Sequence, residues 1–135
     1  MRIKQTTFYA LRALHAIEQS GKRLITSKAI SEKEHISAGV MIRILRILHQ
    51  TGFLSVHQGR GGISGGFALK RSTEEITLLD VVDAMEGLDI CGTLDAGTKR
   101  AEKEFYIHCQ QINSLIREEL ARHTLHELFS HENMK

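Results

Sequence analysis

Residues 36–58 read ISAGVMIRILRILHQTGFLSVHQ and contain the pattern that decides the fold. Ser37 is a residue type that caps helices at their N-terminus. The apolar residues after it recur at three- and four-residue intervals: Met41, Ile44, Leu45 and Leu48. Gly52 ends this pattern, and an extended, partly apolar stretch begins at Phe53. The stretch therefore predicts a helix over residues 38–50 that leads almost directly into a β-strand.

Two further helices are predicted before this one, and a second strand after it. Helical spacing of apolar residues predicts a helix over residues 6–20, and Thr26 is a candidate cap for a short helix ending near His35. Their inward faces should carry Phe8, Ala10, Leu11, Leu14, Ile17, Ala29 and Ile30. Residues 53–58 and 66–70 are expected to pair as a hairpin, since five glycines in the eight residues 59–66 exclude a helix there.

Three short helices followed by a hairpin is the element order of a winged helix-turn-helix. The sequence thus predicts a mainly α fold with a small β-hairpin wing. In that fold the helix at 38–50 enters the major groove of DNA, and the wing, here residues 58–66, contacts the minor groove or the backbone.

The rest of the chain predicts helices. Thr77 and Asp80 have the spacing of a capping box, at the start of a helix that stops at Gly87. A loop over residues 88–98 precedes a long helix over 99–122, and a last helical segment is expected at 124–129, followed by a frayed tail. We divide the chain into a winged helix-turn-helix region, 1–75, and a helical sensor and dimerisation region, 76–135, within one continuous domain.

The long helix carries apolar residues at intervals of three and four, here called the seam: Phe105, Cys109, Ile112, Ile116 and Leu120. Such a period suits packing against another helix. We expect the seam to form the interface of a homodimer, in which two recognition helices lie about 34 Å apart and read a palindromic site. The alternative is that the helix packs only on its own domain.

Composition bounds the class of protein. The 135 residues are 41% hydrophobic and 25% charged, as in an ordinary soluble domain, and no apolar stretch approaches the ~20 residues of a membrane helix. The N-terminus lacks the apolar core of a signal peptide, and two cysteines are too few for a disulfide framework. We therefore expect a cytoplasmic protein with reduced thiols and no membrane partner.

Charge is distributed unevenly along the chain. Residues 1–71 hold 12 Lys/Arg and 3 acidic residues, a net of +9, whereas residues 72–135 hold 6 and 13, a net of −7. A basic half of this kind usually faces a polyanion. The basic residues expected at the DNA surface are Arg2, Lys4, Arg43, Arg46, Arg60, Lys70 and Arg71. Arg43 is predicted to contact a base and Arg60 the minor groove; the alternative for each is a solvated surface arginine.

Five short motifs follow one another along the chain: YALRAL at 9–14, IS at 36–37, GFL at 52–54, GGFAL at 65–69 and EITLLDVV at 75–82. Together with the Met-Arg start and Glu86-Gly87, they resemble the Rrf2 family of bacterial winged helix-turn-helix regulators over residues 1–129. The resemblance implies a homodimeric transcription factor, often a repressor, in a family that includes sensors of iron–sulfur status, nitric oxide, iron and cysteine metabolism. The DNA contacts that it implies are Lys4, Tyr9, Ser37, Ile42, Arg43 and Arg60.

The chain departs from the family's cluster-binding branch in two places. Val40 and the pair Ile42-Arg43 replace the aromatic and the acid–amide pair of that branch's recognition helix, so a different operator is expected. Of the branch's three cysteines, Cys91 occupies the first place, nothing matches the second, Lys103 stands near the third, and Cys109 falls about six residues beyond it.

The sensor region therefore predicts no cofactor, since an iron–sulfur cluster usually needs four protein ligands. A cluster with ligands drawn from both subunits stays an alternative. Cys91 is the candidate sensor, through thiol chemistry, against the alternatives of an inert loop cysteine, a small-molecule effector or no effector. Cys109 is expected to be buried at the dimer interface. His123 and His126, three residues apart, are expected to be surface histidines, and no metal site is predicted.

We expect a homodimeric, sequence-specific DNA-binding regulator, with a protein-interaction module of winged-helix fold as the alternative. No Ser-His-Asp or Cys-His arrangement, metal motif or paired carboxylates point to catalysis, so an enzyme is not expected.

Overall fold

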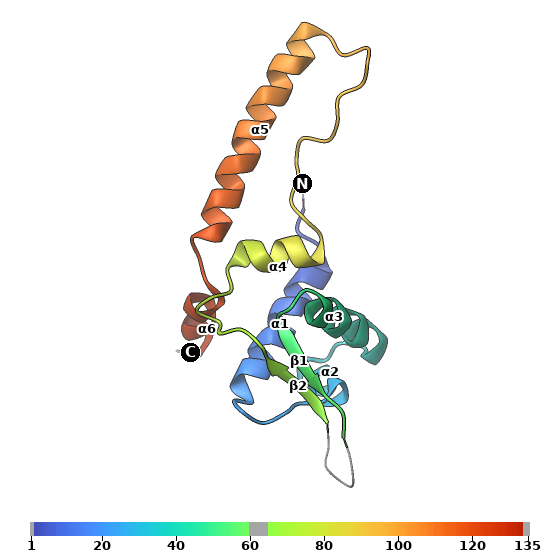
Figure 1. Ribbon diagram of the computed structural model, residues 1–135, viewed down its shortest axis with the longest axis vertical. Helices are drawn as coiled ribbons and strands as arrows, with labels where there is room; N and C mark the ends of the chain where they lie inside the picture. Colours follow the sequence, from blue (N-terminus) through green and yellow to red (C-terminus); the bar gives the residue numbers. More distant parts are fainter. Residues whose placement is uncertain (1, 60–64, 134–135) are drawn as a thin grey trace.

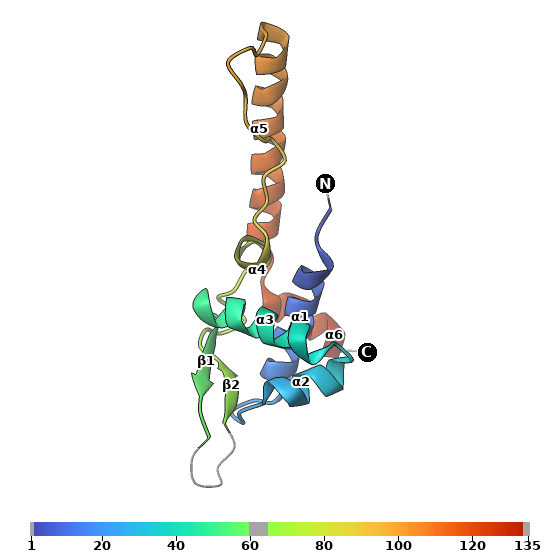
Figure 2. The ribbon, with the colours of Figure 1, turned by 90° about the vertical axis from the view of Figure 1, so that its right-hand side faces the viewer.

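The computed structural model describes residues 2–59 and 65–133 of the chain. In chain order its elements are α1 (Gln5–Gln19), α2 (Ser27–Glu34), α3 (Ala38–Gln50), β1 (Leu54–His57), β2 (Gly66–Leu69), α4 (Leu78–Met85), α5 (Arg100–Ala121) and α6 (Leu125–Asn133). Helices α1–α3 and the hairpin form a winged unit, and α5 rises from it as an arm with the loop of residues 88–99 alongside (Figure 1). The turned view in Figure 2 shows the same long arm. The fold is a mainly helical winged helix, as predicted.

Short polar side chains set the helix starts that the sequence predicts. The hydroxyl oxygens of Thr26 and Ser37 accept hydrogen bonds from the backbone amides of Ala29 (3.1 Å) and Val40 (3.4 Å), at the N-termini of α2 and α3. Between these helices His35 adopts the left-handed conformation, with φ 55°, which turns the chain within the helix-turn-helix.

The capping box at the start of α4 forms as predicted. Thr77 accepts from the Asp80 amide at 3.1 Å, and the Asp80 carboxylate accepts from the Thr77 amide at 2.9 Å.

The core lies between α1, α2, α3, α4, α6 and the hairpin. All four residues predicted to face inward on α3 are at most 2% exposed. Two predictions were wrong: Phe8 is 49% exposed, and Ala29 is exposed. On α1 the buried stripe begins at Thr7, and Phe8 lies 100° around the helix from it. On α2 Ile30 alone is buried, because this short helix turns a narrow face to the core.

The hairpin is antiparallel, with Leu54 opposite Leu69 and Val56 opposite Phe67. Phe67 also exchanges two backbone hydrogen bonds with Ile25, at 2.8 and 3.2 Å, so the segment before α2 borders the hairpin. At Gly66, φ is +154°, and a Cβ would lie 2.7 Å from the Ile25 carbonyl oxygen. Only glycine fits this close approach, which explains one residue of the glycine-rich segment.

Helix α6 returns the chain to the core. Leu125 and Phe129 are buried there, and the Phe129 ring lies 4.7 Å from the ring of His15. Helix α6 continues beyond the predicted 124–129, as far as Asn133, where a frayed tail was expected. The predicted bounds of α5 are correct to within one residue at each end. The structure describes every residue of α5, and none of them is buried.

Candidate nucleic-acid interface

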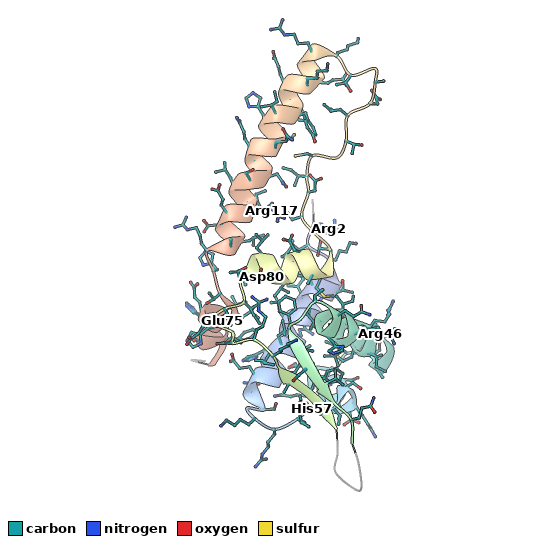
Figure 3. The ribbon with its side chains drawn as sticks, viewed as in Figure 1. Arg2, Arg46, His57, Glu75, Asp80 and Arg117 are labelled. Atoms are coloured by element: carbon teal, nitrogen blue, oxygen red, sulfur yellow. The ribbon has the colours of Figure 1, made fainter. Side chains whose placement is uncertain are left out.

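Helix α3 presents a basic, partly apolar outward face. Arg43, Arg46 and His49 are exposed, and so is Ile42, at 45%. Ser37 is exposed at the N-terminus of the helix, so α3 brings together four of the predicted contacts: Ser37, Ile42, Arg43 and Arg46. Figure 3 shows Arg46 at the outer edge of α3, away from the arm. Cations on an exposed helix suited to a groove can contact phosphates and base edges.

The predicted contacts on and beside the hairpin lie in different surroundings. His57 ends β1, is exposed and lies at the end of the two strands that is remote from the arm (Figure 3). Arg60, the predicted minor-groove contact, lies outside the described residues. Lys70 is exposed, but Arg71 is engaged within the protein. Its guanidinium donates to the Glu75 carbonyl oxygen at 3.1 Å, lies 3.7 Å from Asp80 and stacks 5.5 Å from the centre of the Phe53 ring.

The predicted contacts near the N-terminus lie in different surroundings. Lys4 caps α1, and its backbone amide donates to the Glu86 carboxylate at 2.9 Å, which leaves its exposed side chain to face solvent. Tyr9 is half-buried, and the guanidinium of Arg12 lies 5.3 Å from its ring centre. Arg2 lies beside the arm and apart from Arg46 (Figure 3), in a hollow that it shares with Glu86, Gly87, Leu88, Asp89, Ile90, Ile3 and Ile116.

Sequence reasoning missed a hollow between α2, α3 and the hairpin, here called the α3 hollow. It measures about 260 Å³ and is lined by Ser27, Ile42, Arg46, His49, Val56 and Phe67. Val56 and Phe67 were predicted to lie in strands. The sequence does not show which face of the hairpin lies next to α3, because tertiary packing decides this. The only signal in the sequence is Val56, an apolar residue between Ser55 and His57.

The seam on α5 is only part of a wider apolar surface. Phe105 is 70% exposed and Ile112 48%, while Cys109, Ile116 and Leu120 are half-buried. Two apolar side chains outside the seam are also exposed: Ile107, at 52%, and Leu115, at 64%. Exposed apolar area on this scale along one helix is characteristic of an interaction surface.

The two cysteines line one hollow of about 410 Å³, the thiol hollow, between the loop of residues 88–99 and α5. Its lining residues are Ile90, Cys91, Leu94, Ala101, Glu102, Phe105, Tyr106 and Cys109. The pKa of the Cys91 thiol is raised above its ordinary value. The largest cause of this raised pKa is removal of the thiol from water, the second is the negative charge of the Asp89 carboxylate, and Cys109 adds a smaller effect. The shared hollow was not predicted, because the cysteines stand 18 positions apart on different elements.

The described residues do not fit a metal cluster within one chain. No group of three or more His, Cys, Asp or Glu side chains among them is arranged to hold a metal ion. The thiol hollow supplies two thiols, whereas a cluster usually takes four ligands. His123 contacts Glu119 (3.0 Å) and Glu127 (3.2 Å). These hydrogen bonds, with Glu119 first, raise the pKa of His123.

Two acidic residues of α4 and its C-terminal cap, Glu86, connect the parts of the molecule. The Asp80 carboxylate pairs with Arg71 at the base of the hairpin, and that of Asp83 with Arg117 of α5. The Glu86 carboxylate, at the end of the helix, accepts from the Lys4 amide and from the Thr7 hydroxyl at the start of α1. Helix α4 is therefore bonded to the arm and to two parts of the winged unit.

Comparison with known proteins gives concordant matches. The family model Rrf2, described as an iron-dependent transcriptional regulator, matches residues 3–131. Protein aau3 of Rhizobium meliloti (strain 1021) is 34% identical over 86 residues, 64% of this chain and 54% of that protein. The putative HTH-type transcriptional regulator YwgB of Bacillus subtilis (strain 168) is 36% identical over 63 residues, 47% of this chain and 38% of YwgB. The chain thus matches about half, or less, of the length of these curated relatives.

Two solved structures share the fold. The structure of CymR (YrzC), the global cysteine regulator of B. subtilis, superposes with a TM-score of 0.74 at 22% identity, over 97% of this chain and 98% of that one. The structure of T. potens IscR gives a TM-score of 0.72 at 20% identity, over 98% and 88%. No helix in the described part of the chain is both long and apolar enough to cross a membrane.

Proposed function

Because the chain belongs to the Rrf2 family of transcriptional regulators, we propose that it binds a palindromic operator as a homodimer and acts as a repressor. The family consists of regulators, so the chain is not an enzyme. The observation that carries the proposal is the exposed face of α3, where Arg43 and Arg46 stand on a helix that a winged-helix fold presents to the major groove.

The residues on this face have different roles in the proposal. Arg43, in the first half of α3, contacts a base edge, whereas Arg46, one turn later, binds phosphate. Ser37, which caps α3, and Ile42 complete the contact with the major groove. Lys4 and Tyr9, at the start of α1, approach the sugar–phosphate backbone of DNA. The wing, residues 58–66 with Arg60, contacts the minor groove or the backbone. Arg2, beside the arm, makes a long-range electrostatic contribution.

The second copy of the chain covers the apolar face of α5. Phe105 and Ile112 of the seam are too exposed to stabilise the monomer, and pairing with the same face of a partner removes them from water. A two-fold arrangement then places two α3 helices about one DNA turn, ~34 Å, apart.

Cys91 is the candidate sensor residue, with an inert loop cysteine as the alternative. It is half-buried beside Cys109 in the thiol hollow, at the junction between the loop and α5. Because its pKa is raised, little of this thiol is ionised at neutral pH, which favours the inert cysteine, and we expect it to react slowly with an alkylating reagent. Iodoacetamide labelling of the wild type and Cys91→Ser measures that rate.

Selection of an operator from a random duplex library, followed by titration of variants, tests DNA binding. Arg43→Ala should cost ~1–3 kcal/mol and relax the sequence preference at one position, whereas Arg46→Ala should weaken all duplexes and lower the salt slope by about 1. Arg60→Ala should also flatten the slope. Arg100, exposed at the start of α5, provides the matched control Arg100→Ala, which should bind as the wild type does. Unchanged specificity in Arg43→Ala would remove the base contact from the proposal.

A further inference from the structure

The α3 hollow has an apolar floor on a surface that is otherwise basic. Ile42 and Val56 are 45% and 42% exposed, and both line the hollow together with the half-buried ring of Phe67. Arg46 and His49 form part of its rim, and none of the six lining residues is acidic. Scattered exposed apolar residues need no explanation, but these come from a helix and two strands and converge in one place.

The floor of the hollow is held in place independently of any ligand. Val56 faces Phe67 across the hairpin, and the Phe67 backbone is fixed on its other side by the two hydrogen bonds to Ile25. Ile42 lies on α3, whose other side is anchored by the buried Met41 and Leu45. The apolar surface therefore does not depend on a side chain being recruited when a ligand arrives.

We propose that the α3 hollow receives the 5-methyl group of a thymine in the major groove, with Ile42 and Val56 as the contact surface; this rests on the proposed DNA binding. Thymine alone among the four bases presents a methyl group in that groove, and apolar side chains are its natural partners. The rim supplies the complementary charge, because Arg46 can bind a phosphate while Ile42, one helical turn before it on the same side of α3, meets the base.

This assignment adds a second reader of sequence beside Arg43. A guanidinium detects acceptors on a base edge, whereas the hollow detects a methyl group and so favours T over C at a fixed position. Burial of one methyl group corresponds to about a fourfold change in affinity. In a palindromic site the contact occurs twice, and the two effects together amount to about sixteenfold.

Uracil substitution tests the inference, because deoxyuridine differs from thymidine only by the missing methyl group. Each thymine of the selected operator is replaced in turn, and binding of the full-length protein is measured. One thymine per half-site should lose about fourfold in affinity when it becomes uracil. Ile42→Ala and Val56→Thr should bind the thymine and uracil duplexes equally well. The control Leu128→Ala, an exposed apolar residue of α6, should discriminate as the wild type does.

Each other outcome overturns the inference. If every uracil duplex binds the wild type within twofold of the parent operator, the hollow does not read a methyl group, although the proposed function stands. Discrimination that persists in both variants would place the methyl contact elsewhere. If no duplex is selected at all, the proposed function fails and the inference fails with it. Two variants are used, on α3 and on β1, so that a folding defect in one, detected by circular dichroism, does not decide the result.

Discussion

The pair between Arg117 of α5 and Asp83 of α4 is expected to contribute measurably to stability. Both terminal nitrogens of the guanidinium donate to the two carboxylate oxygens, each at 2.9 Å, and one of them also lies 3.4 Å from the Leu88 carbonyl oxygen. This two-bonded geometry is the strongest form of an arginine–carboxylate pair. It joins the arm to α4 at a point where α5 has no buried residue of its own.

The size of the coupling free energy between Arg117 and Asp83 follows from the exposure of the two side chains. The side chains are 35% and 41% exposed, so water screens the pair and either partner is solvated when the other is removed. We therefore expect a coupling free energy of about 1 kcal/mol, well below the ~3–5 kcal/mol of a buried pair that loses one partner. For a chain of this length, loss of ~1 kcal/mol lowers Tm by about 4 °C.

A double-mutant cycle isolates this coupling. Arg117→Ala, Asp83→Ala and the double variant are unfolded in urea at one fixed protein concentration, since the proposed dimerisation would make stability depend on concentration. The matched control is the pair Arg100–Glu104, 3.5 Å apart on a single exposed face of α5, with an expected coupling of about 0.3 kcal/mol. At 1 M salt, where the screening length is ~3 Å, the Arg117–Asp83 coupling should fall. A coupling equal to that of the control, or unchanged by salt, would refute the reasoning.

Three further predictions concern the core, the arm and pH. Leu45→Ala should cost ~2–5 kcal/mol in urea unfolding, because this residue of α3 is fully buried; a smaller loss would mean that the site collapses around the cavity. Phe105→Glu should shift the protein towards monomer in light scattering without lowering monomer stability, and an unaltered mass would exclude this side chain from the interface. His123 has a raised pKa, so the stability it contributes is fully present below its ordinary value of 6.5 and is lost as pH rises through the raised value. The wild type should therefore have a higher Tm than His123→Gln, and this difference in Tm should be larger at about pH 6 than at about pH 8.5. The same difference at both pH values would show that protonation of His123 does not contribute to stability.

Much of the fold could be predicted because the interactions that form its helices join residues a few positions apart in the sequence. The caps at Thr26, Ser37 and Thr77 depend on residues three positions away, and the inward face of α3 depends on a helical period. Such interactions are fixed by the backbone geometry of a single element. The starts of α2, α3 and α4 and the buried face of α3 were accordingly predicted correctly.

The features that sequence reasoning missed depend on which elements meet. Phe8 has the residue type of a core position, but α1 places it outside the stripe that packs on α3 and α4. The role of Arg71 follows from Asp80, a residue of the next helix, and the shared hollow of Cys91 and Cys109 follows from the path of a loop. No period or cap in the sequence specifies these distances, so the structure was needed to find them.

The bonds of α4 indicate how the arm is joined to the winged unit. Asp80 and Asp83 lie three positions apart on α4, whereas Glu86 caps the C-terminus of the helix, and the three carboxylates meet different partners. Asp80 holds the base of the hairpin, Glu86 the start of α1 and Asp83 the arm. Loss of the Asp83 pair would remove one link between the arm and α4, while the Leu78 amide at the start of α4 still donates to the His123 carbonyl oxygen, just after α5, at 2.9 Å.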